Sequence, residues 1–92
     1  MKVGIDKSFP RDVDRIDNKN VLKKLRVLIS ELEKAESIQD IKGLRKIEGY
    51  GSYCRIKIGE YRLGLEVRSG KEVALIRFLN RKDIYRFFPK KK

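Results

Sequence analysis

The chain has 92 residues, 40% of them hydrophobic, which is enough for one small domain with a single modest core. Lysine and arginine number 24 against 13 aspartates and glutamates, so the net charge is +11. The chain has no histidine and one cysteine, which excludes imidazole catalysis, Ser-His-Asp triads, intrachain disulfides and zinc sites built on histidine or cysteine.

The first half of the chain predicts one strand followed by two helices. Residues 2–6 (KVGID) form a short strand, and Ser8 with Pro10 gives a helix-start signal for a short helix over about 11–16. Apolar residues recur at helical spacing from Val21 to about Glu36, which predicts a second helix. Two helices with a short connection predict an antiparallel helical hairpin lying on a sheet.

The second half of the chain predicts three consecutive strands. Residues 37–52 contain scattered apolar residues and three glycines, and we interpret them as a connector. Two alternating segments, 53–58 and 61–67, then flank Gly59-Glu60 as a hairpin. The segment 72–80 (EVALIRFLN) is almost continuously apolar, which is typical of a strand covered on both faces over part of its length.

The chain is expected to end in a helical turn over 81–88, closed by Pro89 and followed by a solvated lysine tail. The whole of 1–92 is then one α+β domain. An N-terminal strand leads into a two-helix hairpin, which packs on a mainly antiparallel four-stranded sheet with a short C-terminal helix.

The hairpin predicts which side chains share a face. A type II′ turn at Gly59-Glu60 pairs Lys57 with Arg62 and Arg55 with Gly64. Side chains alternate between the two faces of a strand. The face expected under the helices then holds Cys54, Ile56, Ile58, Tyr61, Leu63 and Leu65, and the other holds Tyr53, Arg55, Lys57, Arg62, Gly64 and Glu66.

The second of these faces is unusually basic. Like charges that oppose each other across strands destabilise a sheet by up to about 1 kcal/mol. Gly64 weakens its strand but permits close approach of a ligand. Residues 50–92 contain twelve basic and four acidic side chains, which indicates a polyanionic partner, most commonly a nucleic acid. An acidic protein, an anionic membrane or a merely solvated basic face would also fit.

More candidate residues follow the last strand. If 81–88 is helical, Arg81 and Tyr85 share a face. Arginine binds phosphate oxygens in a bidentate manner, and tyrosine stacks on bases or exchanges a proton. Lys82 and Arg86 lie beside them, and with Arg77 they are predicted to bind RNA.

Other residues invite a structural interpretation. Cys54 lies on the predicted buried face and has no neighbouring histidine as a base, so it is expected to be a core residue. Phe87 and Phe88 are expected to be core or dimer-contact aromatics. The acidic residues are scattered, so neither a magnesium site nor any other cofactor is predicted.

The available chemistry is therefore arginine, lysine and tyrosine without histidine or metal. That set suits phosphodiester transfer on RNA, in which the 2′-hydroxyl is the nucleophile and guanidinium groups stabilise the pentavalent phosphorane. DNA lacks this nucleophile.

The string YCRIKIGEYRLGLEV…VALIRFLNRKDIYRFFP resembles the RelE/ParE superfamily of bacterial and archaeal type II toxins, and its RelE branch in particular. The lead-in LRKIEGYGSY is similar too, and the order of elements matches over nearly the whole chain. The resemblance implies an mRNA interferase, an endoribonuclease that cuts mRNA in the ribosomal A site and inhibits translation. It also implies that a cognate antitoxin inactivates the protein in a toxin–antitoxin hetero-oligomer.

The resemblance also implies roles for individual residues. Arg55 and Lys57 match two basic strand positions that contact phosphate and assist proton transfer. Arg62 and Arg81 match arginines that stabilise the transition state. Tyr85 matches a tyrosine that stacks on, or acts at, the cleaved nucleotide.

Two positions depart from the family pattern. Asn80 stands where many relatives carry histidine, and Arg55 replaces a lysine of some active members. Because arginine is a poor proton carrier, Lys57 and Tyr85 are the expected base and acid, in either order.

Two alternatives stay open on the sequence. One is a ParE-like toxin that inhibits DNA gyrase through protein contacts. The other is a non-catalytic module, either a degenerate toxin or a basic RNA-binding domain. The N-terminus has no apolar run like that of a signal peptide, and no segment of the sequence approaches a membrane span, so a soluble cytoplasmic protein without a membrane partner is expected.

Overall fold

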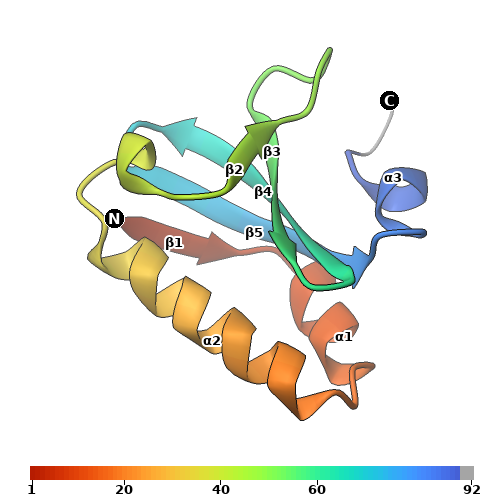
Figure 1. Ribbon diagram of the computed structural model, residues 1–92. Helices are drawn as coiled ribbons and strands as arrows, with labels where there is room; N and C mark the ends of the chain where they lie inside the picture. Colours follow the sequence, from red (N-terminus) through yellow and green to blue (C-terminus); the bar gives the residue numbers. More distant parts are fainter. Residues whose placement is uncertain (90–92) are drawn as a thin grey trace.

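A five-stranded sheet is the centre of the protein, for which a computed structural model describes residues 1–89 (Figure 1). The spatial order is β1-β5-β4-β3-β2, in which β1 is parallel to β5 and every other pair is antiparallel. The strands are β1 (Lys2–Ile5), β2 (Leu44–Lys46), β3 (Tyr53–Ile58), β4 (Tyr61–Ser69) and β5 (Glu72–Asn80). The predicted α+β class, with helices on a mainly antiparallel sheet, is confirmed.

The number of strands is corrected from four to five. The additional strand, β2, lies within residues 37–52, which the sequence pattern presents as a connector, and the same segment contains a short 3-10 helix at Ile38–Asp40. β2 pairs with β3 at the edge of the sheet. A strand of three residues is too short for an alternating pattern to be visible in the sequence.

Both helices of the first half begin earlier than predicted. α1 (Ser8–Asp14) has Lys7 at its N-cap position without a side-chain cap, so Ser8 is a helical residue and not the cap. α2 (Lys19–Lys34) begins after Asn18, whose Oδ1 accepts hydrogen bonds from the backbone N–H groups of Asn20 and Val21 at 3.0 and 3.2 Å. This side chain satisfies two N–H groups that a helix start otherwise leaves without partners.

The core lies between α2 and one face of the sheet (Figure 1). The hairpin register is the predicted one, with Lys57 paired to Arg62 and Arg55 to Gly64. Gly59, the first residue of the turn, has the positive φ of 58° that a type II′ turn requires. As predicted, the face under α2 buries Cys54, Ile56, Ile58, Leu63 and Leu65, while Tyr61 is partly buried.

The C-terminal segment covers part of the opposite face of the sheet. α3 (Ile84–Phe87) is shorter than the predicted helical segment 81–88, and Arg81 lies in the turn before it. The prediction that Arg81 and Tyr85 share a helical face is therefore wrong. The predicted lysine tail, residues 90–92, lies outside the described residues.

The two C-terminal phenylalanines have different environments. Phe88 is 1% exposed and packs edge-to-face with Tyr53, at 5.4 Å between ring centroids, so its prediction as a core residue is confirmed. Phe87 is 51% exposed and is not a core residue, and the Arg77 guanidinium lies 5.3 Å from the centre of its ring.

Gly64 is the point where Phe88 meets the sheet. A Cβ atom at this position would lie only 2.6–2.8 Å from three ring carbons of Phe88. The close approach that Gly64 permits is therefore made by the chain's own phenylalanine. This corrects the expectation that a ligand approaches the backbone here.

Gly64→Ala is expected to lower the free energy of unfolding by about 1–3 kcal/mol, because the added methyl group must displace a fully buried ring. Urea unfolding followed by circular dichroism measures the change. Gly70→Ala is the matched control, since nothing lies within 4 Å of a Cβ at that position. Equal stability of the two variants would contradict the proposed packing.

Candidate functional site

Four basic side chains lie on the face of the sheet opposite α2. Lys57 pairs directly with Arg62, and Arg55 lies between Arg45 of β2 and Gly64 of β4. Residues directly opposite one another across strands have their Cβ atoms about 4.5–5.5 Å apart. Within residues 1–89, none of these four side chains has a carboxylate oxygen within 4.0 Å. The structure thus brings Arg55, Lys57 and Arg62 together as predicted. We call these three and Arg45 the basic strip.

Arg45 is a member of the strip that the sequence does not predict. It belongs to β2, which the sequence did not reveal, and it faces Arg55 only because these two strands pair. The tripeptide Leu-Arg-Lys by itself carries no signal of such pairing. Only the register of the sheet adds Arg45 to the strip.

The hairpin turn holds two arginines at the same end of the sheet. Nη1 of Arg62 donates hydrogen bonds to the carbonyl oxygens of Gly59 and Tyr61 at 3.0 and 2.9 Å. The backbone N–H of Arg81 donates to the carbonyl of Glu60 at 2.8 Å, and its Nε lies 2.7 Å from Oε2 of the same residue. Both contacts leave other N–H groups of each guanidinium free to bind an anion, since arginine has five.

Asn80 shapes the turn that contains Arg81. Its side-chain Oδ1 accepts a hydrogen bond from the backbone N–H of Lys82 at 3.0 Å, and its carbonyl accepts one from Asp83 at 2.9 Å. Asparagine commonly stabilises turns through such side-chain contacts to the backbone. Asn80, which stands where the family pattern often has histidine, therefore has a structural role in this turn. Lys82, predicted to bind RNA, is exposed beside it.

A groove runs across the same side of the molecule. Its lining includes residues of α3, Phe88, Tyr50 and Tyr53. Tyr85, which is 56% exposed, and Arg86 both line it. Arg55, Lys57, Arg62 and Arg81 do not line this groove. The predicted catalytic residues therefore fall into two groups, with Tyr85 in the groove and the four basic residues outside it.

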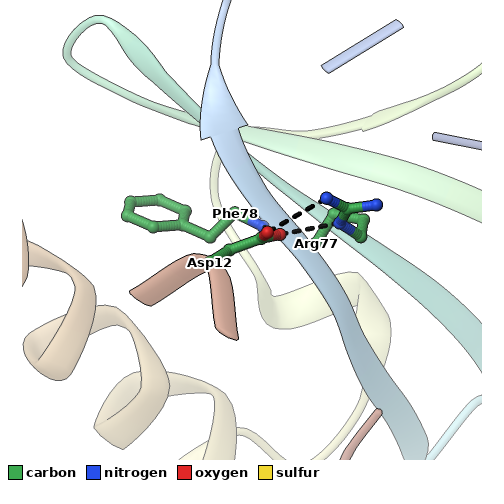
Figure 2. A network of polar contacts seen from close by, with 3 residues as sticks. All are labelled: Asp12, Arg77 and Phe78. Carbon is green, nitrogen blue, oxygen red and sulfur yellow. Dashed lines mark hydrogen bonds and ion pairs between the residues drawn. The ribbon is translucent and has the colours of Figure 1, made fainter. Parts of the chain in front are cut away.

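Arg77, a predicted RNA-binding residue, lines the groove but is held by a buried carboxylate (Figure 2). Its Nε and Nη2 donate to the two carboxylate oxygens of Asp12 at 2.7 and 3.0 Å. Asp12, only 3% exposed, also accepts a hydrogen bond from the backbone N–H of Phe78 at 2.9 Å. This N–H belongs to the part of β5 beyond Leu75, the last residue that pairs with β1. The ion pair thus gives Arg77 a structural role, in joining α1 to β5.

Cys54 is buried in the core, as predicted. Burial raises the pKa of its thiol, and the positive charge of Lys46 on the paired strand opposes this effect only in part. A raised pKa keeps the sulfur as the unreactive thiol. Cys54 therefore fits a packing role.

Metal-binding clusters and membrane-spanning helices are both absent from the part of the chain that the structure describes. Residues 1–89 contain no group of three or more Cys, Asp or Glu side chains placed to hold a metal ion. No helix in the same range is long and apolar enough to cross a membrane.

Comparison with known proteins gave one curated relative of nearly the same length. The chain is 38% identical over 90 residues to Toxin RelE3 of Methanocaldococcus jannaschii, covering 97% of this chain and 100% of the relative. No family model matches the chain.

The fold is also similar to solved structures. One is the RelB–RelE antitoxin–toxin complex of Methanococcus jannaschii, with a TM-score of 0.78 and 33% identity over 94% of this chain and 99% of that one. Another is the E. coli DinJ–YafQ complex, with a TM-score of 0.60 over 95% and 97% of the two chains. Its 15% identity supports likeness of fold alone.

Proposed function

Because this chain belongs to the RelE family of type II toxin–antitoxin toxins, we propose that it is an endoribonuclease that cuts messenger RNA. The cut needs no metal ion, takes place on mRNA that is being translated on the ribosome, and inhibits protein synthesis. The nucleophile is the 2′-hydroxyl of the RNA itself.

The observation that carries this proposal is the basic strip. Lys57 and Arg62 oppose each other across β3 and β4, with Arg55 on the same face, and no carboxylate in the described chain neutralises them. In the free protein these positive charges repel one another, and a bound phosphate backbone relieves that repulsion. A surface that had only to be soluble would not need the three charges side by side.

The chemical step is an in-line transfer within the RNA. The 2′-hydroxyl attacks the adjacent phosphorus while a base removes its proton, and the bond to the 5′-oxygen breaks as an acid protonates that oxygen. The products are a 2′,3′-cyclic phosphate and a 5′-hydroxyl, and no water is consumed. Lys57 and Tyr85 are the two proton carriers, in either order.

The arginines stabilise the charge that develops on the phosphorane. Arg62 is held by the carbonyls of the turn, and this contact orients its remaining N–H groups before RNA binds. Arg55 and Arg81 add further positive charge, and Arg81 reaches the phosphate once its exposed ion pair with Glu60 has broken.

RNA binding outside the reacting phosphate falls to Lys82 and Arg86. Lys82 is exposed in the turn after β5, and Arg86 lines the groove. Contacts of this kind position the RNA and carry no sequence information. Arg77 contributes through the N–H groups that Asp12 leaves unbound, in addition to its structural role.

A cognate antitoxin is the proposed protein partner. The similar structure from Methanococcus jannaschii is an antitoxin–toxin complex, and the net charge of +11 favours a partner with acidic segments. Such a partner forms a hetero-oligomer with the toxin and covers the basic strip. Binding there would displace mRNA.

Mapping of RNA ends after brief expression tests the function. The wild type is expected to yield codon-phased cuts with 5′-hydroxyl ends inside translated messages. Tyr85→Phe is expected to lower their frequency by about two orders of magnitude or more if the hydroxyl transfers a proton. Because the ring remains, this variant preserves stacking.

Two other results would overturn the proposal. Intact mRNA with blocked DNA supercoiling would assign the chain to the gyrase-inhibiting toxins. Unchanged growth and unchanged RNA in cells that contain the folded protein would assign it to non-catalytic RNA-binding modules.

A further inference from the structure

The groove beside α3 has a composition that catalysis by the basic strip does not explain. It is lined by three tyrosines, Tyr50, Tyr53 and Tyr85, together with Phe87. Two carboxylate residues, Asp6 and Glu66, also line it, and Glu66 is the one that pairs directly with Tyr53 across β3 and β4. Aromatic rings beside a hydrogen-bond acceptor are typical of sites that hold an unpaired nucleobase.

We propose that this groove binds one unpaired base of the RNA next to the cut, and that Glu66 discriminates against uracil. The inference rests on the proposed function, for which it names a base-binding subsite. It adds a specificity residue, Glu66, and a stacking residue, Tyr53, to residues that act on phosphate.

Part of the groove is built from side chains that pack on one another. Phe88 is pressed against Gly64 and forms part of the wall, and Tyr53 meets the Phe88 ring at 88° between ring planes. Tyr53 is thus held in place before any ligand arrives. A ring fixed in this way stacks on a base without losing much conformational freedom.

Two of the three arginines that line the groove are paired with carboxylates. Asp12 pairs with Arg77, and Nε of Arg68 donates to Oε1 of Glu66 at 3.0 Å. Arg86 is the remaining arginine of the groove, and within residues 1–89 it has no carboxylate partner. The groove therefore offers one free guanidinium, which suits the phosphate of the nucleotide whose base is bound.

Glu66 is the group that reads the base. Arg68 fixes its carboxylate through Oε1, while Oε2 has no hydrogen-bond donor among the described residues. An ionised carboxylate only accepts hydrogen bonds. The exocyclic amines of adenine, cytosine and guanine donate to it. Uracil has no amine, and its two carbonyl oxygens flank its single N–H and repel the carboxylate.

Binding of RNA that cannot be cut tests this site apart from catalysis. Fluorescent hexamers of adenosine, cytidine or uridine with 2′-O-methyl groups lack the nucleophile, and their affinities follow from fluorescence anisotropy at one fixed salt concentration. The wild type is expected to bind the adenosine and cytidine hexamers roughly tenfold more tightly than the uridine hexamer, the effect of one hydrogen bond to a charged group.

Two variants assign the effect to the groove. Glu66→Gln presents an amide that also donates to carbonyl oxygens, so the preference against uridine is expected to disappear. Tyr53→Leu removes the stacking ring and is expected to weaken all three hexamers by roughly tenfold, with the preference retained. Lys23→Ala, on the exposed side of α2, removes a positive charge elsewhere and leaves the ratio of affinities unchanged.

The base site is overturned if the wild type binds the three hexamers equally, binds none of them, or keeps its preference in Glu66→Gln. Such results leave the map of RNA ends intact. Loss of the cleavage map itself would instead refute the nuclease, whatever the hexamers show.

Discussion

Arg62→Ala is expected to slow RNA cleavage by about two to three orders of magnitude, the effect typical of removing one donor that stabilises developing charge. The guanidinium is oriented by two carbonyl oxygens of the hairpin turn and faces Lys57 across the strands. Single-turnover cleavage of a defined mRNA on programmed ribosomes measures the rate. Binding of the mRNA should weaken much less than the rate falls.

Two further variants test whether the effect comes from the Arg62 guanidinium itself or from overall charge. Arg62→Lys keeps the charge but loses the planar fork, so its rate is expected to lie between the wild type and Arg62→Ala. Lys23→Ala removes one positive charge from the far side of the sheet and should cut at the wild-type rate. If it loses as much activity as Arg62→Ala, then overall charge and not a site on the hairpin determines cleavage.

Asp12→Ala is expected to lower the free energy of unfolding by about 3–5 kcal/mol, because it leaves a largely buried guanidinium without its counter-ion. It also leaves the backbone N–H of Phe78 without its acceptor. Chemical denaturation measures the loss. A small domain has only about 5–15 kcal/mol of stability, so the variant is expected to be partly unfolded near physiological temperature.

A double variant separates the two causes of this loss of stability, the unpaired guanidinium and the unpaired N–H. Asp12→Ala combined with Arg77→Met removes both charges and should recover part of the stability, with the unpaired N–H of Phe78 accounting for the remainder. Asp14→Ala, an exposed carboxylate on the same helix, should change stability by less than about 0.5 kcal/mol. A double variant as unstable as the single one would mean that the ion pair contributes little.

Phe88 adjoins both the basic strip and the groove on the face of the sheet opposite α2. Gly64, over which the ring packs, pairs with Arg55 of the basic strip, and Phe88 itself lines the groove beside α3. An RNA strand that reaches both regions must pass this ring. Tyr85, the second residue of α3, lines the groove, and the proton transfer proposed for it therefore requires the scissile phosphate to lie near Phe88.

The sequence by itself determined the hairpin and the sharing of its faces. Alternation along residues 53–58 and 61–67, with glycine at the first turn position, specified the pairing of Lys57 with Arg62. These signals are local, because a two-residue turn sets the register of both strands and a slip of one residue would expose the core. The cluster of Arg55, Lys57 and Arg62 is therefore predictable from the order of the residues alone.

Only the tertiary structure decided the contacts between distant segments. Asp12 and Arg77 are 65 positions apart, Arg45 faces Arg55 through a three-residue edge strand, and Phe88 fills the space above Gly64. The periodicity of the sequence does not reveal any of these contacts, because each partner is a single residue within a different local pattern. Their contact depends on how the helices and the C-terminal segment pack on the sheet. Because of that packing, Phe88 occupies the space over Gly64 where a ligand was expected, and Arg77 has a structural ion pair with Asp12 that the sequence did not predict.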